Sequence, residues 1–297
     1  NFLAMKQQGL LYGPVTPLLP NFRFVDVTAK RSNVIDFTTP VAGYAVPWRL
    51  AQVVFIYDSA RLRDPKDVPR SALELLAWAR KNPGRVTHPN PSNFLGATFL
   101  KQALYELVAD PTLLQQPASD ESFARITAPL WPWYDALRPM LWRKGEQFPE
   151  NGAVQRQLLN DGEIDITLSF TPAEAAVSVL AGKLPESVRS FTFSKGTIGN
   201  TSFVAIPYNS RAKEGAMLLA NFLLEPATQA RAQDVKSIGS VNVLDAAKLS
   251  PAQRALFDAL TPSPALPTPA ELGIAQLEPH ASWMTRLTTE WQRRYSR

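Results

Sequence analysis

The order of helical and extended segments in the middle of the chain constrains its fold more than any other sequence feature. Residues 155–159 have a helical pattern, residues 160–162 (Asn-Asp-Gly) predict a tight turn, and residues 164–170 alternate as a strand does. A second helix is expected next, with Thr171 as its N-cap and Pro172 at its first helical position. A helix, a turn, a strand and another helix in this order are typical of an α/β fold.

The same alternation continues along the rest of the sequence. Further strands are predicted at residues 22–27, 46–57, 85–88 and 203–207, and further helices at residues 1–11, 69–82, 94–107, 212–232 and 283–295. The second of these helices begins with a Ser71-x-x-Glu74 capping box, and the Pro-rich residues 262–269 are predicted to form a linker. Strands and helices interleaved at this spacing predict α/β lobes with largely parallel sheets.

Length and composition set the number of lobes and exclude several classes of protein. A chain of 297 residues is longer than one hydrophobic core usually grows, so two lobes are expected. With 45% hydrophobic and 19% charged residues, the chain is neither disordered nor a coiled coil. No apolar run approaches the ~20 residues that cross a bilayer. The net charge of +5 comes from scattered basic residues, which does not predict a nucleic-acid-binding arm.

The sequence lacks the residues that most catalytic and metal sites require. It has no cysteine, which excludes disulfides, thiolate-bound metals and thiol catalysis. Its two histidines, His88 and His280, are isolated, and no phosphate-binding loop or nucleophile elbow occurs. The carboxylates within residues 161–165 lack the spacing of a calcium loop, so a solvated turn explains them better. We therefore predict no metal site, no cofactor and no catalytic residue.

Three segments carry a resemblance to a known family. They are residues 46–57 (VPWRLAQVVFIY), residues 162–170 (GEIDITLSF), and residues 203–229, which include NFLLEPATQ. With these segments in this order, the chain resembles the extracellular solute-binding proteins of bacterial ABC importers. Within them it is most similar to the group of thiamine-, iron- and spermidine/putrescine-type receptors, and in particular to the YnjB type.

The resemblance implies a fold, a division into domains and a location. The fold is the type II periplasmic-binding-protein fold, with two α/β lobes joined by crossing strands and a ligand cleft between the lobes. Lobe one would comprise residues 1–55 and 204–297, and lobe two residues 56–203. Family members carry a signal or lipoprotein segment and a first part of lobe one upstream of the point that corresponds to residue 1. A periplasmic location is therefore expected, with that N-terminal part missing from this sequence.

The resemblance also implies a function. The protein would capture a small solute in the cleft by hinge closure and deliver it to an ABC transporter permease in the inner membrane. It would act as a monomer, would not be an enzyme, and would bind no nucleic acid. Only the closed state would contact the ligand from both lobes, so it would have the higher affinity for the ligand. Ligand binding would therefore increase the population of the closed state.

Candidate ligand-binding residues follow from the rule that ligands bind beyond the C-terminal ends of strands in open α/β sheets. The residues are Asn93, Phe94 and Thr98 at a helix start, Ser169, Phe170 and Thr171 after a strand, Asn200 and Thr201 beside the return crossing, Tyr12 and Trp48 from lobe one, and Trp142 beside a turn. For the helix start, a purely structural N-cap remains an equal alternative. The set is neutral and aromatic, which favours a thiamine-like ligand or another small organic cation. Arg49 or Arg143 could equally place an anion in the cleft.

Two other classes of function remain open. A two-lobed hydrolase or transferase would bind a small molecule in the same cleft, but it requires a nucleophile and a base that nothing in the sequence selects. A nucleic-acid regulator with this fold as its effector domain would need a helix-turn-helix, and none is visible.

Overall fold

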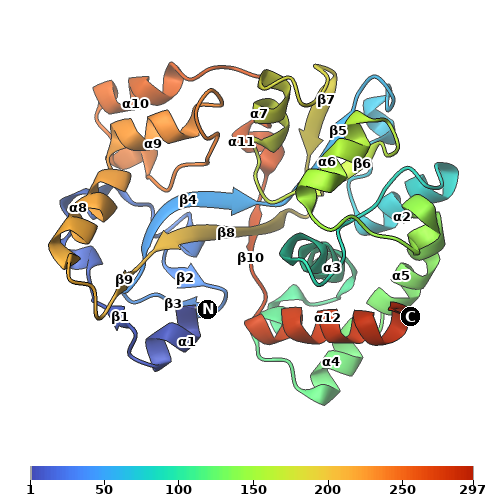
Figure 1. Cartoon of the computed structure of the whole chain (residues 1–297), viewed down its shortest axis with the longest axis horizontal. Coiled ribbons are helices and arrows are strands. Elements are labelled where there is room, and N and C mark those ends of the chain that lie inside the picture. Colours follow the sequence, from blue (N-terminus) through green and yellow to red (C-terminus); the bar gives the residue numbers. More distant parts are fainter. Residues whose placement is uncertain (1, 297) are drawn as a thin grey trace. The chain divides into compact units, whose positions relative to one another are not determined.

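The computed structural model describes residues 2–296 and divides into two compact units (Figure 1). The first unit comprises Asn1–Ala51 and Gly199–Ser263, and the second comprises Gln52–Ile198 and Pro264–Arg297. The chain therefore passes from one unit to the other three times. The third passage, after Ser263, lies in the stretch that the sequence predicts as a linker.

The first unit contains short strands and four helices. Its helices are α1 (Phe2–Gln7), α8 (Lys213–Leu223), α9 (Pro226–Gln233) and α10 (Pro251–Asp258); its strands are β1 (Leu11–Tyr12), β2 (Ile35–Asp36), β3 (Thr39–Pro40), β4 (Val46–Gln52), β8 (Thr197–Val204) and β9 (Ile206–Pro207). Strands β4 and β8 are neighbours in one sheet, and each crosses the boundary between the units at one end. Val15, Val25, Val243 and Leu224 are fully buried at the centre of its core.

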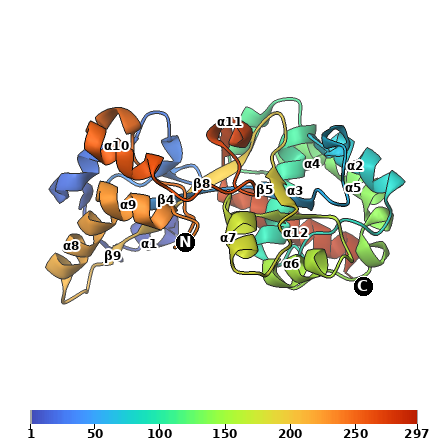
Figure 2. The same cartoon turned by 90° about the horizontal axis from the view of Figure 1, so that it is seen from above.

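The second unit is larger and contains one central three-stranded sheet. Its helices are α2 (Ala72–Lys81), α3 (Phe94–Leu107), α4 (Asp120–Thr127), α5 (Leu130–Leu137), α6 (Gly152–Asn160), α7 (Glu174–Leu180), α11 (Pro269–Leu272) and α12 (Ala281–Tyr295); its strands are β5 (Val54–Asp58), β6 (Ile166–Ser169), β7 (Val188–Phe191) and β10 (Ala275–Leu277). The sheet order is β6-β5-β7, and Figure 2 shows α6 and α7 close to each other in this unit.

The three-stranded sheet of the second unit is antiparallel, whereas the sequence predicts largely parallel sheets. Strand β5 pairs antiparallel with both β6 and β7, with Val54 opposite Ser169 and Phe55 opposite Phe191. The pair β1–β9 and the pair β2–β3 are antiparallel as well. The predicted strand at residues 85–88 is reduced to a single parallel bridge between Val86 and Ile166. Alternating helices and strands show the α/β class, but strand direction depends on long-range pairing.

The C-terminal residues belong to the second unit, which corrects the expected assignment of residues 264–297 to lobe one. Helix α12 buries Trp283, Leu287 and Trp291, each at most 1% exposed, in the core of the second unit. Just before α12, the Glu278 carboxylate pairs with Lys101 of α3 at 2.6 Å. The sequence pattern predicts this amphipathic helix correctly, but it does not indicate which core receives the apolar face.

Proline positions explain two further differences from the predicted elements. The long helix expected at residues 212–232 is two helices, because Pro226 lacks the N–H that would continue α8 and instead starts α9. The first half of the strand expected at residues 22–27 lies in a 3₁₀ helix, Pro20–Phe24, which has Pro20 as its first residue. In both places, the proline lies at the first position of a helix, where a backbone N–H would have no acceptor within the helix.

Two boundaries also differ from the predictions. The long strand expected at residues 46–57 is divided at Val53 into β4 and β5, and the backbone N–H of Val53 donates to the carbonyl of Ile198. Helix α7 begins at Glu174 with Ala173 as its N-cap, so Thr171 is not the cap. The cap predicted for α2 is present, since the Ser71 side chain accepts from the Glu74 N–H.

Candidate functional site

The start of α3 is held in place by its cap and by a tightly packed loop. Asn93 is the N-cap, and its side-chain oxygen accepts a hydrogen bond of 2.9 Å from the Leu95 N–H. A Cβ at Gly96 would collide with the carbonyl oxygens of Pro89 and Asn90, so only glycine permits this close approach. Thr98 is fully buried and donates to the Phe94 carbonyl at 2.8 Å, whereas the Phe94 ring is 44% exposed.

The segment after β6 forms a second fixed group. The Ser169 hydroxyl is buried, donates to Glu174 Oε2 at 2.9 Å and accepts from the Thr171 N–H at 3.0 Å. Glu174 also pairs with the Arg156 guanidinium of α6. These contacts fix the turn that carries the half-buried Phe170 ring.

The structure brings these two groups together. The rings of Phe94 and Phe170 lie 5.5 Å apart between their centres, at an angle of 55°. We call the six predicted residues of the two groups the α3–β6 surface: Asn93, Phe94, Thr98, Ser169, Phe170 and Thr171. A cavity of about 350 Å³ adjoins it, lined by residues 91–94 and Ala97 together with Met284, Thr285, Thr288 and Thr289 of α12. Buried Thr98 and Ser169 support this surface, and the two rings and Asn93 are accessible on it.

Trp142 does not join this surface. Its indole N–H donates to Glu163 at 2.8 Å, and its backbone N–H donates to the Val86 carbonyl at 2.9 Å. Glu163 precedes the first residue of β6, whereas Phe170 follows the last one, so the two aromatic residues lie at opposite ends of the same strand.

The remaining predicted residues belong to the first unit. Tyr12 lies in β1 and Trp48 in β4, where the Trp48 carbonyl accepts a hydrogen bond of 2.7 Å from Gln229. Asn200 and Thr201 lie in β8. Thr201 is 6% exposed, and its hydroxyl lies 2.9 Å from Ser32 Oγ, so this side chain supports the unit's interior rather than its surface.

Four of the five predicted aromatic residues already have a cation of this chain over the ring. Lys213 lies 5.2 Å from the centre of the Tyr12 ring, Arg49 4.9 Å from Trp48, Lys101 4.9 Å from Phe94, and Arg143 4.3 Å from Trp142. A ligand cation on the other face of such a ring would lie roughly 9 Å from the first cation and be repelled by about 2 kcal/mol at an effective dielectric constant of about 20. This equals or exceeds the cation–π attraction of about 0.5–2 kcal/mol. At Phe94 the charge of Lys101 is compensated by Glu278, so this argument against an organic cation applies only to the rings of Tyr12, Trp48 and Trp142.

Two ion pairs beside the α3–β6 surface were not predicted. Lys101 and Glu278 are each 1% exposed and lie 177 residues apart in the chain. Arg156 and Glu174 are 18 residues apart, on α6 and at the start of α7. No local sequence pattern links such partners, because the pairing depends on how the helices pack.

His88, one of the two histidines, lies in the interior of the second unit. His88 is fully buried between Phe99 and Phe148; its Nδ1 donates to the Pro89 carbonyl and its Nε2 accepts from the Tyr134 hydroxyl. Burial lowers the pKa of His88 to about 4, so it is neutral at physiological pH. Trp131, Trp133 and Tyr134 are core residues. Within residues 2–296, no group of three or more His, Asp or Glu side chains is placed to hold a metal ion.

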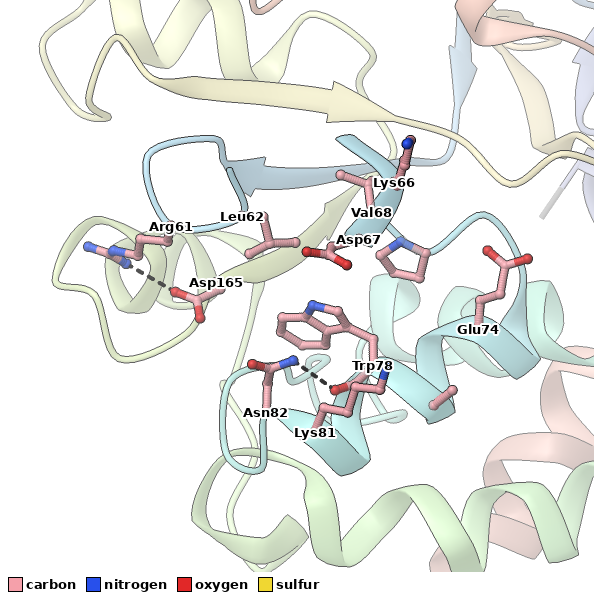
Figure 3. Close-up of a pocket in the computed structure, with 12 residues that line it drawn as sticks. Arg61, Leu62, Lys66, Asp67, Val68, Glu74, Trp78, Lys81, Asn82 and Asp165 are labelled. Carbon is pink, nitrogen blue, oxygen red and sulfur yellow. Dashed lines mark hydrogen bonds and ion pairs between the residues drawn. The ribbon is translucent and has the colours of Figure 1, made fainter. Parts of the chain in front are cut away.

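A second cavity of the second unit contains none of the predicted residues (Figure 3). It has a volume of about 460 Å³ and lies near Asp165, at the end of β6 away from Phe170. Arg61 on its wall is tied to Asp58, to Asp165 and to two backbone carbonyls, and Asn82 donates to the Trp78 carbonyl. Because these polar groups already hold the unit together, we assign the candidate site to the α3–β6 surface.

Comparison with known proteins identifies the family. The model of the family described as bacterial extracellular solute-binding protein matches residues 3–256. Protein YnjB of Escherichia coli (strain K12) is 40% identical over 295 residues, which cover 99% of this chain and 73% of that protein. In the described part of the chain, no helix is both long enough and apolar enough to cross a membrane.

Solved structures show the same fold at low sequence identity. The Tp0655 (TpPotD) lipoprotein of Treponema pallidum has a TM-score of 0.66 at 15% identity, over 99% of this chain and 81% of that chain. A periplasmic thiamin binding protein has a TM-score of 0.59 at 21% identity, over 99% and 75% of the respective chains. Both support the type II periplasmic-binding-protein fold that the sequence predicts. The family model matches residues 3–256, which is most of the chain, and protein YnjB is 40% identical over nearly all of it. The chain therefore belongs to the bacterial extracellular solute-binding protein family.

Proposed function

We propose that this protein is the periplasmic solute-binding component of an ABC importer, that it holds one small solute, and that it passes the solute to a membrane permease without converting it. Membership of the family supports the transport role. The single observation that carries the location of the site is the pair of rings, exposed Phe94 and half-buried Phe170, whose centres lie 5.5 Å apart. Such an apolar platform with a few fixed polar groups is typical of small-molecule sites.

The proposed mechanism uses both units. The α3–β6 surface would supply the platform in the second unit, and Tyr12, Trp48 and Asn200 would contact the solute from the first unit. A solute that contacts both units only in one arrangement has a higher affinity for that arrangement and increases its population. A permease that recognises the arrangement then distinguishes loaded from empty protein. We further propose that a signal or lipoprotein segment directs the protein to the periplasm and that it acts as a monomer.

The direct test is ligand-dependent thermal stabilisation combined with native mass spectrometry of the purified protein. A solute at 100 times its Kd stabilises the folded state by about 2.7 kcal/mol, which raises the melting temperature by a few degrees. The double variant Phe94→Ala/Phe170→Ala should lose this ligand-induced rise. The control Leu73→Ala, which truncates an apolar side chain that is 65% exposed on α2, should keep it. Chemical conversion of a bound solute would instead favour the enzyme alternative.

A further inference from the structure

Arg49 is a positioned arginine that no acidic residue neutralises. Its guanidinium lies 4.9 Å from the centre of the Trp48 ring, and its Nε donates to Ser202 Oγ of β8 at 3.3 Å. It forms no ion pair with a carboxylate of the described residues, and its terminal nitrogens have no hydrogen-bond partner there. The residue is half-buried, and its ring stacking limits the conformations of the side chain.

The first unit as a whole carries most of the net positive charge of the chain. It has 11 Lys and Arg residues and 7 Asp and Glu residues, a net charge of +4, whereas the second unit has a net charge of +1. Lys213, which lies over the Tyr12 ring, also forms no ion pair within residues 2–296. The two aromatic residues predicted to contact the solute from this unit are thus accompanied by two unneutralised cations. Such a field attracts anions.

The second unit offers no free carboxylate to a cationic solute at the proposed site. The carboxylate beside the α3–β6 surface, Glu174, pairs with Arg156 and accepts from Ser169. The cation beneath Phe94, Lys101, is compensated by Glu278. The charges of these residues of the second unit therefore cancel, so a charge preference would have to come from the residues proposed in the first unit.

We propose that the transported solute carries an oxyanion group, and that Arg49 is the residue that receives it. This inference rests on the proposed function and specifies its solute class. The guanidinium presents two terminal N–H pairs in a planar fork, which matches the oxygens of a phosphate, sulfonate or carboxylate. Ser202 and Trp48 position the fork, and Lys213 adds a second positive charge within the same unit.

The test uses pairs of probe compounds that differ only in an oxyanion. Glucose and glucose 6-phosphate, thiamine and thiamine monophosphate, and pyridoxal and pyridoxal 5-phosphate are added to the purified full chain, with putrescine, inorganic phosphate and inorganic sulfate alongside. Thermal shift and calorimetric titration report binding. We expect stabilisation by a phosphorylated member of a pair or by an inorganic oxyanion, and none by an unphosphorylated member or by putrescine.

Variants then test Arg49 itself. Arg49→Met should weaken binding of the anion that stabilises the protein by roughly 10- to 100-fold, because it removes a charged hydrogen-bond donor pair. Arg49→Lys, which keeps the charge without the fork, should retain part of the affinity. The matched control is Arg23→Met: Arg23 also lies in the first unit and lies 4.7 Å from the centre of an adjacent aromatic ring, Phe24, but belongs to no proposed site. It should bind as the unaltered protein does.

The possible failures are distinguishable. Binding of only uncharged or cationic probes would overturn the oxyanion inference and leave the proposed function standing. Equal anion affinity in Arg49→Met and Arg23→Met would overturn the assignment to Arg49. Binding of no probe, with no small molecule retained in native mass spectra, would count against both the inference and the proposed function.

Discussion

Removal of one partner of the buried Lys101–Glu278 pair is expected to destabilise the second unit strongly. Both side chains are 1% exposed, and their charged atoms lie 2.6 Å apart. Lys101→Met keeps most of the side-chain volume but leaves the Glu278 carboxylate without its main compensating charge. The cost of leaving one charge of a buried pair unpaired is about 3–5 kcal/mol.

The geometry also predicts how the two residues combine. The double variant Lys101→Met/Glu278→Leu removes both charges and their desolvation, so it should recover most of the stability lost in Lys101→Met. The matched control is Arg286→Met. The Arg286–Asp120 pair has the same separation of 2.6 Å, but the Asp120 side chain is 96% exposed, so its loss should cost no more than about 1 kcal/mol.

Urea unfolding followed by tryptophan fluorescence measures these differences, because Trp283 and Trp291 are buried in the same core. The expected order of stability is unaltered protein, then Arg286→Met, then the double variant, then Lys101→Met. If the free energy of unfolding falls no more in Lys101→Met than in Arg286→Met, the reasoning is refuted, since burial would then not change how much an ion pair contributes to stability.

Three further predictions follow from the same structure. Gly96→Ala should destabilise the protein by about 2 kcal/mol or more, because the new Cβ meets backbone atoms. Gly215→Ala, in an open part of α8, should stabilise it by up to about 1 kcal/mol. Chemical unfolding compares the two variants, and equal changes in unfolding free energy would contradict the packing at α3. Because His88 has a folded pKa of about 4, below its ordinary 6.5, its contribution to stability is complete above pH 6.5 and is lost as the pH falls towards 4, by about 3 kcal/mol in all. Unfolding free energies measured across this pH range should therefore decrease less in His88→Gln than in the unaltered protein. An identical decrease in both proteins would show that His88 is not the cause. Trp142→Phe should leave the ligand-induced rise in melting temperature unchanged while Phe170→Ala reduces it; a loss in Trp142→Phe would return this residue to the site.

Several parts of the candidate site follow directly from sequence rules. Asn93 before an apolar helical pattern predicts the cap of α3, and the structure contains that cap. The strand β6 and the helix after it are likewise predicted, although Thr171 does not cap that helix. Local signals of this kind succeed because they depend on neighbours within a few residues of the chain.

The properties that decide solute class do not follow from local signals. The sequence shows aromatic residues at the predicted positions, but not that Lys213, Arg49 and Lys101 lie over three of their rings. It shows Glu174 near the site, but not that Arg156 neutralises it. Once the side chains are placed, the aromatic residues Tyr12 and Trp48 of the first unit each have a cation over the ring, which the sequence alone does not show.

By itself, the sequence determined the α/β class, the presence of two units, several of the helices and the family. These features depend on periodicity, on capping residues and on proline positions, which act over one or two helical turns. Tertiary structure alone decided that the sheet β6-β5-β7 is antiparallel, that the last 34 residues join the second unit and which charges are neutralised. The physical reason is that strand direction, core membership and ion pairing are set by contacts between residues far apart in the chain, for which a single sequence carries no local pattern.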